Sequence, residues 1–168
     1  MIEVAPNLWV GSQADYEGKM FPLGAWAVVF CAKEPWHRQA LGYSGRSAPV
    51  GHPEYLVARR GCRLILNLVD VDNPDYVHRE LVDAAMEFIA VELGKGKRVL
   101  IICNQGKSRS PVIAMLYLGC PSGVSFEDAE ADFKQRYPDY APARGMREFA
   151  RTNWDRYAAF VGDTRITV

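Results

Sequence analysis

The sequence predicts an α/β fold with a central mixed, mostly parallel sheet that is flanked by helices. Continuous apolar runs, of the kind buried on both faces of such a sheet, lie at residues 26–30, 64–69 and 99–102. Segments with a helical spacing of apolar side chains follow these runs along the chain. Since its 168 residues contain no internal repeat or linker, we expect a single domain over residues 1–168.

The expected elements follow one another in a definite order. Residues 8–10 form a first strand that ends at Gly11-Ser12, and the three apolar runs form the next strands. The first long helix covers residues 76–93, between the start signal Asn73-Pro74-Asp75 and the stop signal Gly94.

Three more helices are expected towards the end of the chain. Residues 111–118 carry proline in their first turn. Ser125 and Asp128 resemble a capping box that opens the next helix, which must end before Pro138. The last helix covers residues 144–160.

Residues 35–61 hold much of the glycine and proline and form the least regular segment. A long loop in a compact domain is usually functional or mobile. Within it, Trp36-His37-Arg38 follows a strand end and is a candidate to border a binding pocket. The three histidines, His37, His52 and His78, belong to no motif and are expected at the surface or in loops.

The composition, with 49% hydrophobic and 24% charged residues, is that of an ordinary globular protein. Its 20 basic and 20 acidic side chains cancel, so no overall field favours nucleic acid or an anionic membrane. No stretch approaches the roughly 20 apolar residues of a membrane-spanning helix, and the first residues lack a signal-peptide pattern. We therefore expect a cytoplasmic protein without a membrane or nucleic-acid partner.

Four cysteines are spread widely, at positions 31, 62, 103 and 120. They form no CxxC pair and have no accompanying histidine spacing, which argues against a zinc site and a disulfide framework. We expect no metal, no cofactor and no chemical role for Cys31, Cys62 and Cys120.

One segment, VLIICNQGKSRSPV at residues 99–112, combines a thiol with groups that hold anions. Its GKS tripeptide matches the end of a nucleotide-binding P-loop, but that motif requires glycine where this chain has Ile101. Between a buried strand and a helix, residues 103–109 instead bring backbone N–H groups and a helix N-terminus around one point, which favours a tetrahedral anion. Arg109 adds a planar fork for two phosphate oxygens.

The expected phosphate ligands are the amides of this loop and the guanidinium that follows them. They belong to Asn104, Gln105, Gly106, Lys107, Ser108 and Arg109. Cys103 would lie beneath the bound phosphorus, where these groups favour the nucleophilic thiolate. The alternative is a buried structural cysteine beside a solvated basic loop.

Cys103, five intervening residues, Arg109 and Ser110 resemble the C-x5-R-S/T signature of the cysteine-dependent protein tyrosine phosphatases, and most closely the dual-specificity phosphatases. The resemblance covers most of the chain. IEVAPNLWVGSQAD resembles their opening strand and turn, LNLVDVDNPD the strand before their acid loop, and SFEDAEADFKQRYPDYAPARGMREF their closing helices. The resemblance implies a phosphatase-like fold and a dual-specificity phosphatase-like catalytic domain.

The resemblance also implies phosphate monoester hydrolysis through a phosphocysteine. Cys103 is then the nucleophile, and Arg109 with the loop amides binds phosphate and stabilises the transition state. The family's acid, which protonates the leaving oxygen and later activates water, matches Asp72, 31 residues before Cys103. Asp70, as a strand-end residue, and Asp75, as a helix cap, compete for this role.

Three positions bear on the remaining alternatives. Ser110 corresponds to the hydroxyl that stabilises the departing thiolate, a role compatible with helix capping. Ile102 replaces the family's usual histidine, which leaves open a pseudophosphatase that only binds phosphate. Lys107 is expected to be a solvated surface residue, although a cation in this loop also occurs in phosphoinositide phosphatases.

The expected partners are proteins that carry phosphotyrosine, and also phosphoserine or phosphothreonine, together with phosphate or other oxyanions in the site. A phosphatase that acts on phosphoinositide or RNA phosphates is the further alternative.

Overall fold

The computed structural model describes residues 1–18, 25–119, 124–157 and 159. Its centre is a six-stranded sheet in the order β1-β2-β6-β3-β5-β4. Four inner strands run parallel to one another: β2 (Leu8–Ser12), β6 (Arg98–Cys103), β3 (Trp26–Phe30) and β5 (Arg63–Leu66). The edge strands β1 (Ile2–Ala5) and β4 (Val57–Arg59) are antiparallel to their neighbours. The predicted mixed, mostly parallel sheet is confirmed.

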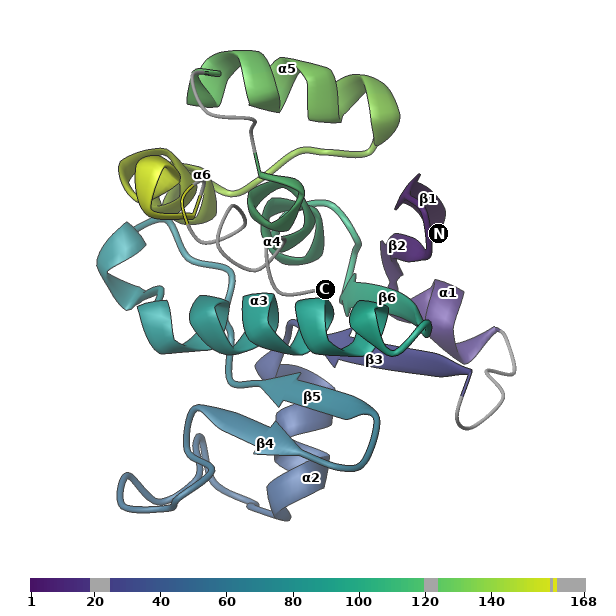
Figure 1. Ribbon diagram of the computed structural model, residues 1–168. Coiled ribbons are helices and arrows are strands. Elements are labelled where there is room, and N and C mark those ends of the chain that lie inside the picture. The colour runs from purple at the N-terminus through teal and green to yellow at the C-terminus, as the bar shows by residue number, and fades with distance from the viewer. Residues whose placement is uncertain (19–24, 120–123, 158, 160–168) are drawn as a thin grey trace.

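Helices cover both faces of this sheet (Figure 1). The larger core is covered by α3 (Arg79–Gly94), α4 (Arg109–Leu118), α5 (Phe126–Arg136) and α6 (Arg144–Thr152). The smaller core on the other face is covered by α1 (Gln13–Glu17), a helical turn η1 (Lys33–His37) and α2 (Arg38–Leu41). A further turn, η2 (Pro74–Tyr76), precedes α3.

The buried side chains of the inner strands are apolar and alternate between the two cores. In β3, Val29 faces the larger core and Phe30 the smaller; in β6, Ile101 and Ile102 do the same. All four are buried, and full burial of such a side chain contributes about 1.5–3 kcal/mol. The C-terminal ends of β3 and β6 are therefore packed against the cores on both faces of the sheet, and the loop after Cys103 begins at the end of β6.

The predicted helices exist, with altered boundaries. The long helix α3 begins at Arg79 instead of residue 76, because Asn73 caps the separate turn η2 and His78 is extended. The capping interaction of Ser125 with Asp128 is confirmed by a 3.1 Å hydrogen bond from the Asp128 amide to the Ser125 hydroxyl. In the last helix, α6 stops at Thr152, and position 160 lies outside the described residues.

Two edge strands are absent from the sequence-based prediction. Each of them, β1 and β4, has only three or four residues and a single buried side chain, so neither produces an apolar run. β4 also lies, with α2, inside the segment 35–61 that the sequence indicates as irregular.

His37 corrects the expectation that all three histidines lie at the surface or in loops. It is fully buried, with Nε2 3.0 Å from the Glu54 carbonyl and Nδ1 3.3 Å from the Tyr43 hydroxyl. Burial lowers the pKa of His37 and favours the neutral ring. Trp36 is also buried, against Phe30 in the smaller core.

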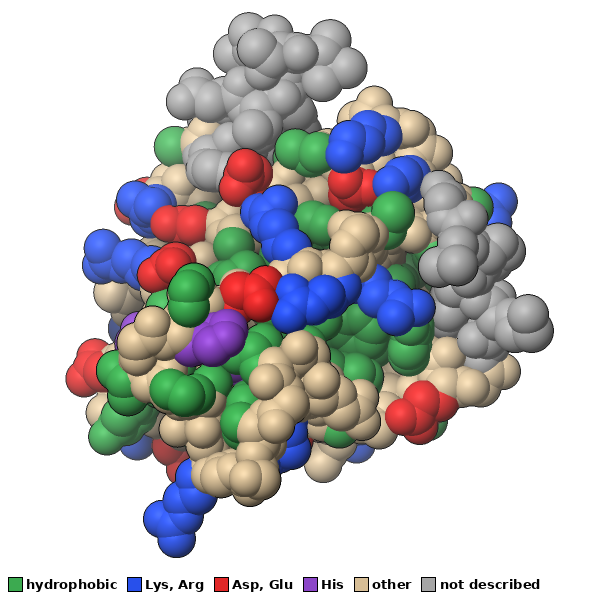
Figure 2. Space-filling model, turned by 90° about the horizontal axis from the view of Figure 1, so that it is seen from below, with side chains coloured by type: hydrophobic (Ala, Val, Ile, Leu, Met, Phe, Trp, Pro, Cys, Tyr) green, Lys and Arg blue, Asp and Glu red, His purple; other side chains and the backbone are tan. Residues whose placement is uncertain are grey.

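Charges of both signs are interspersed on the face shown in Figure 2, in keeping with a formal net charge of zero. The described helices include none that is long and apolar enough to cross a membrane.

Candidate active site

Cys103 is the last residue of β6 and is 1% exposed. The hydroxyl of Ser110, in the first turn of α4, donates towards Cys103 Sγ at 3.2 Å and lies at the same distance from the Gly11 carbonyl. Ser110 is fully buried, so this contact is shielded from water. The two residues that the sequence pairs as nucleophile and leaving-group partner are in direct contact.

Two carbonyl groups of the loop after Cys103 accept hydrogen bonds from other segments of the chain. The amide of Gln13, at the start of α1, donates to the Asn104 carbonyl at 3.2 Å, and the amide of Ala141 donates to the Lys107 carbonyl at 2.9 Å. The backbone N–H groups of residues 104–108 donate to no other residue in the described parts of the chain. They remain available as donors for an anion.

Gly106 makes this loop possible. Its φ of 74° is a left-handed conformation that favours glycine. A Cβ atom at this position would also lie only 3.0–3.1 Å from backbone atoms of Gly11 and Ser12, at the end of β2. The loop therefore rests directly on the neighbouring strand.

Arg109 is 9% exposed and is held by two of its nitrogens. Nη1 donates to the Leu68 carbonyl at 3.2 Å, and Nη2 donates to Asn104 Oδ1 at 2.7 Å. Nε is buried without a hydrogen-bond partner, and its nearest carboxylate oxygen, on Asp70, is 3.9 Å away. A buried donor without a partner is costly, so an oxyanion that reached Nε would satisfy a hydrogen bond that the described residues leave unmade.

A cavity of about 420 Å³ opens above these groups. It is lined by Asp70, Cys103, Asn104, Gln105, Lys107, Ser108, Arg109, Ala141, Pro142 and Ala143. The structure thus brings the predicted nucleophile, arginine and loop together. Trp36-His37-Arg38, the candidate border of the pocket, is not part of this lining, and Trp36 and His37 point into the protein instead.

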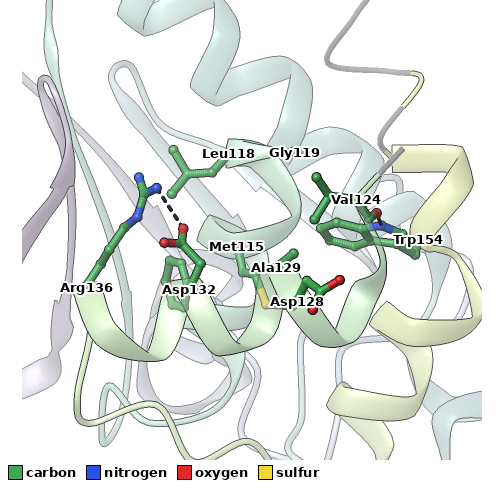
Figure 3. A pocket seen from close by; sticks show the side chains of 10 residues that line it. Met115, Leu118, Gly119, Val124, Asp128, Ala129, Asp132, Arg136 and Trp154 are labelled. Carbon is green, nitrogen blue, oxygen red and sulfur yellow. Dashed lines mark hydrogen bonds and ion pairs between the residues drawn. The ribbon is translucent and has the colours of Figure 1, made fainter. Parts of the chain in front are cut away.

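A second cavity, of about 480 Å³, lies between α4, α5 and Trp154 and shares no lining residue with the first (Figure 3). Its walls combine apolar side chains with the ion pair of Asp132 and Arg136, 2.7 Å apart. The described residues that line it include no cysteine or histidine.

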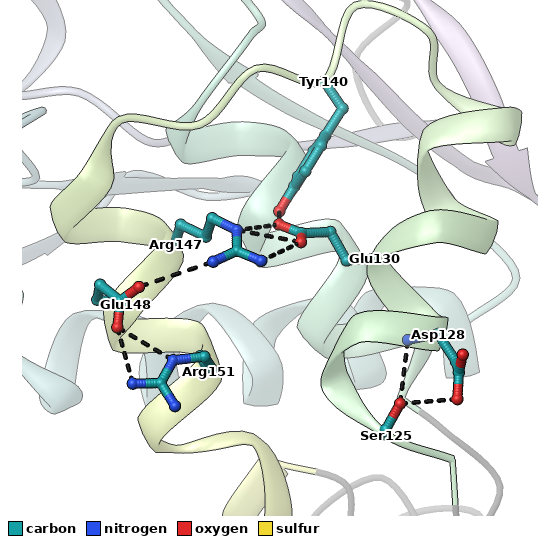
Figure 4. A network of polar contacts seen from close by, with 7 residues as sticks. All are labelled: Ser125, Asp128, Glu130, Tyr140, Arg147, Glu148 and Arg151. Carbon is teal, nitrogen blue, oxygen red and sulfur yellow. Dashed lines mark hydrogen bonds and ion pairs between the residues drawn. The ribbon is translucent and has the colours of Figure 1, made fainter.

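Residues 141–143 form a wall of the first cavity that is not among the predicted site residues. A polar network supports the segments on either side of this wall (Figure 4). Tyr140 donates to Glu130 at 2.9 Å, and Arg147 binds the same carboxylate through Nε and Nη2. Burial, together with the Glu130 charge, raises the pKa of Tyr140. The hydrogen bond to Glu130 raises the pKa of Arg147. Both side chains therefore stay protonated and keep the wall in place.

The three acid candidates occupy different environments. Asp70 lines the cavity and accepts a 2.7 Å hydrogen bond from the Ser108 hydroxyl. Asp72 is exposed in the following loop and is not part of the lining. That loop packs on the start of α6, where the Gly145 amide donates to the Val71 carbonyl at 3.1 Å. Asp75 lies in η2, as a helix-turn residue.

The remaining cysteines differ from Cys103. Burial raises the pKa of Cys31 well above its ordinary value, so its thiol stays neutral and unreactive. Cys62 is half-buried, with Lys97 Nζ 3.0 Å from its sulfur. Cys120 lies outside the described residues. Lys107 is exposed at the mouth of the cavity.

Ile102 faces away from Cys103, into the smaller core, and is fully buried. Ile102→His is expected to destabilise the fold by about 2–4 kcal/mol, because it removes aliphatic packing and buries a polar ring among apolar neighbours. Thermal melting should show a decrease of roughly 5–10 °C. The control Ile102→Val should cost only about 0.5–1.5 kcal/mol. If the histidine variant melts with or above the valine variant, a partner for the ring must exist in this core.

Comparisons with known proteins bear on the fold. No protein-family model matches the chain, and no curated protein matches its sequence. Its structure is similar to the crystal structure of DUSP15, with TM-score 0.66 and 16% identity, covering 100% of this chain and 96% of that chain. It is also similar to human DUSP28, with TM-score 0.60 and 17% identity, covering 96% and 94%.

A third similar structure is that of the human tyrosine phosphatase-like serine/threonine/tyrosine-interacting protein, with TM-score 0.56 and 20% identity, covering 94% of this chain and 95% of that chain. These likenesses span nearly the whole of both chains in each pair. The chain therefore has the mixed α/β fold of the dual-specificity phosphatases.

Proposed function

We propose that the chain is a cysteine-dependent phosphatase of the tyrosine or dual-specificity type, with residues 1–168 as one catalytic domain. Its substrates are phosphorylated proteins that carry phosphotyrosine, and also phosphoserine or phosphothreonine. A cytoplasmic location is in keeping with the free thiols of Cys31, Cys62 and Cys103.

One observation carries this proposal: unpartnered donors surround a buried thiol. The loop amides of residues 104–108 and Arg109 Nε have no partner among the described residues. Asn104, Gln105, Lys107, Ser108 and Arg109 line the same cavity as Cys103. Donors that stand ready for a negative charge, in a site that needs no reorganisation, are the main source of transition-state stabilisation in enzymes. A tetrahedral phosphoryl group satisfies both kinds of donor at once.

In the proposed mechanism the Cys103 thiolate attacks phosphorus, the S–P bond forms and the P–O bond to the leaving group breaks. Asp72 gives its proton to the leaving oxygen. A water molecule then attacks the phosphocysteine, Asp72 takes the water proton, and the S–P bond breaks to release phosphate. The Ser110 hydroxyl, 3.2 Å from Cys103 Sγ, supports the sulfur as its negative charge returns.

Asp72 remains the proposed acid because of its spacing from Cys103, and Asp70 is the competitor because it lines the cavity. Asp72→Asn is expected to slow the hydrolysis of alkyl and phenyl phosphates by roughly 100-fold, since general acid catalysis contributes about 10²–10⁴-fold. It should affect p-nitrophenyl phosphate far less, because that leaving oxygen needs little protonation. The measurement is kcat for the two substrate types.

Asp70→Asn is the matched variant. If it shows the leaving-group dependence and Asp72→Asn does not, the proton donor lies two residues earlier than proposed. In that event the hydrogen bond from the Ser108 hydroxyl would orient the catalytic carboxyl group of Asp70.

The experiment that tests the function is a turnover screen with phosphotyrosine, phosphothreonine and phosphoserine peptides, phosphoinositides and a 5′-phosphorylated RNA. Turnover of the peptides supports the proposal. Preferred turnover of lipid or RNA would move the chain to the corresponding class of phosphatase. Binding of vanadate without turnover of any substrate would identify a pseudophosphatase, the rival suggested by Ile102.

A further inference from the structure

The side chain of Asn104, directly after the nucleophile, connects three segments of the chain. Nδ2 donates to the Glu34 carbonyl at 2.8 Å and lies 3.2 Å from Gln13 Oε1. Oδ1 accepts from Arg109 Nη2 at 2.7 Å. The sequence indicates only the backbone amide of this residue as a phosphate ligand, so the side chain needs its own explanation.

The orientation of this amide is determined by its partners. A carbonyl oxygen and an amide oxygen lie beside Nδ2, and both are acceptors, whereas the guanidinium beside Oδ1 has only donors. A flipped amide would place an acceptor against two acceptors and a donor against a donor. Asn104 can therefore present only its oxygen to Arg109.

This contact controls the direction of the guanidinium plane. Nη1 is bound by the Leu68 carbonyl and Nη2 by Asn104, on two different segments. With both Nη groups bound, the direction of Arg109 Nε, the unpartnered donor, is set by the planar geometry of the guanidinium. Loss of the Asn104 contact leaves Leu68 as the one remaining neutral acceptor among the described residues and allows the plane to rotate.

The segment that supports Asn104 is held by contacts of its own. Glu34, whose carbonyl accepts from Asn104, binds Arg38 through both carboxylate oxygens, at 2.7 and 2.8 Å. Arg38 also donates to the carbonyls of Tyr43 and Gly45, at 3.0 and 2.6 Å. Hydrogen bonds thus connect residues 34–45 to one another. Asn104 binds this segment through Nδ2 and Arg109 through Oδ1.

We propose that Asn104 is a positioning residue that holds the Arg109 guanidinium in the plane needed to bind an oxyanion, with residues 34–45 as its support. This inference rests on the proposed function only in so far as the cavity binds phosphate. It adds a residue that touches neither the phosphorus nor the leaving group through its side chain.

The test is the affinity for vanadate, measured by calorimetry, together with kcat and KM for p-nitrophenyl phosphate. Asn104→Ala is expected to weaken vanadate binding roughly tenfold or more, because it releases a charge-assisted hydrogen bond on the arginine. Asn104→Asp should bind vanadate more weakly still, since its carboxylate neutralises Arg109 and faces the Glu34 carbonyl. Gln13→Ala is the matched control. It removes the longer contact of Asn104 Nδ2, together with an exposed hydrogen bond to Glu17, and should cost less than about threefold.

A double-mutant comparison separates positioning from a general structural effect. In an Arg109→Lys protein, Asn104→Ala should have almost no further effect on vanadate affinity, because the fork that it orients is gone. Equal losses in the parental and Arg109→Lys backgrounds would overturn the inference, as would parental affinity in a folded Asn104→Ala protein.

If Asn104→Ala fails to fold, the affinity of Asn104→Asp for vanadate provides the test, and an affinity equal to that of the parent protein contradicts the inference. A parent protein that does not bind vanadate at all would instead refute the phosphate site, and the proposed function with it.

Discussion

Cys103→Ser is expected to lose turnover by about 10⁴-fold or more and to keep its affinity for phosphate. The loss is large because a serine hydroxyl does not ionise near neutral pH, and removing a covalent nucleophile costs this much in other enzymes. Binding persists because the loop amides and Arg109 are untouched by the change. The measurements are kcat for p-nitrophenyl phosphate and calorimetric titration with phosphate.

Cys31→Ser is the matched control, since Cys31 is also buried and directly follows the neighbouring strand β3. It is expected to retain activity, with at most a modest loss of stability. Appreciable turnover by a Cys103→Ser protein that is free of parental enzyme would remove Cys103 from the mechanism.

Arg109→Lys is expected to lower kcat/KM by roughly 10²–10³-fold and to weaken phosphate binding as well. Removing one positioned donor from a transition state costs about this much. Lysine keeps the charge but cannot hold Leu68 and Asn104 while presenting a further N–H to phosphate, as the guanidinium does. Steady-state kinetics and phosphate titration give the two values.

A suitable control for this change is Lys107→Gln, because Lys107 is an exposed cation of the same loop. If simple positive charge near the cavity were sufficient, Arg109→Lys would be mild and Lys107→Gln would cost as much or more. The opposite order is expected from the buried fork of Arg109.

The inner strands and the anion-binding loop are predictable from the sequence because both depend on local patterns. The apolar run at 99–102 predicts the strand that ends at Cys103, and Gly106 suits the left-handed turn of the loop. The next helix begins at Arg109, two residues before its predicted start, and so includes Arg109 and Ser110 in its first turn. The contact of Ser110 with the Cys103 sulfur follows from that geometry.

The contacts made between distant segments are not predictable in this way. The Ser108 contact with Asp70 spans 38 residues and the Asn104 contact with Glu34 spans 70, and nothing local in the sequence marks either pair. The wall at residues 141–143 acts through backbone atoms and carries no side-chain signature. The burial of His37 is not predictable either, because it depends on the fold of the irregular segment around it.

If Cys103 is the nucleophile, its sulfur carries the phosphoryl group during each turnover, and mass spectrometry of the acid-quenched reaction detects this group most directly. Asp72→Asn protein, in which hydrolysis of the intermediate should be slow, is mixed with p-nitrophenyl phosphate, quenched within the first turnover and digested. The peptide that contains Cys103 is expected to carry one phosphoryl group, which disappears on longer incubation without substrate. Turnover that proceeds with no phosphoryl group on Cys103, or with one on another residue, would contradict the phosphocysteine mechanism.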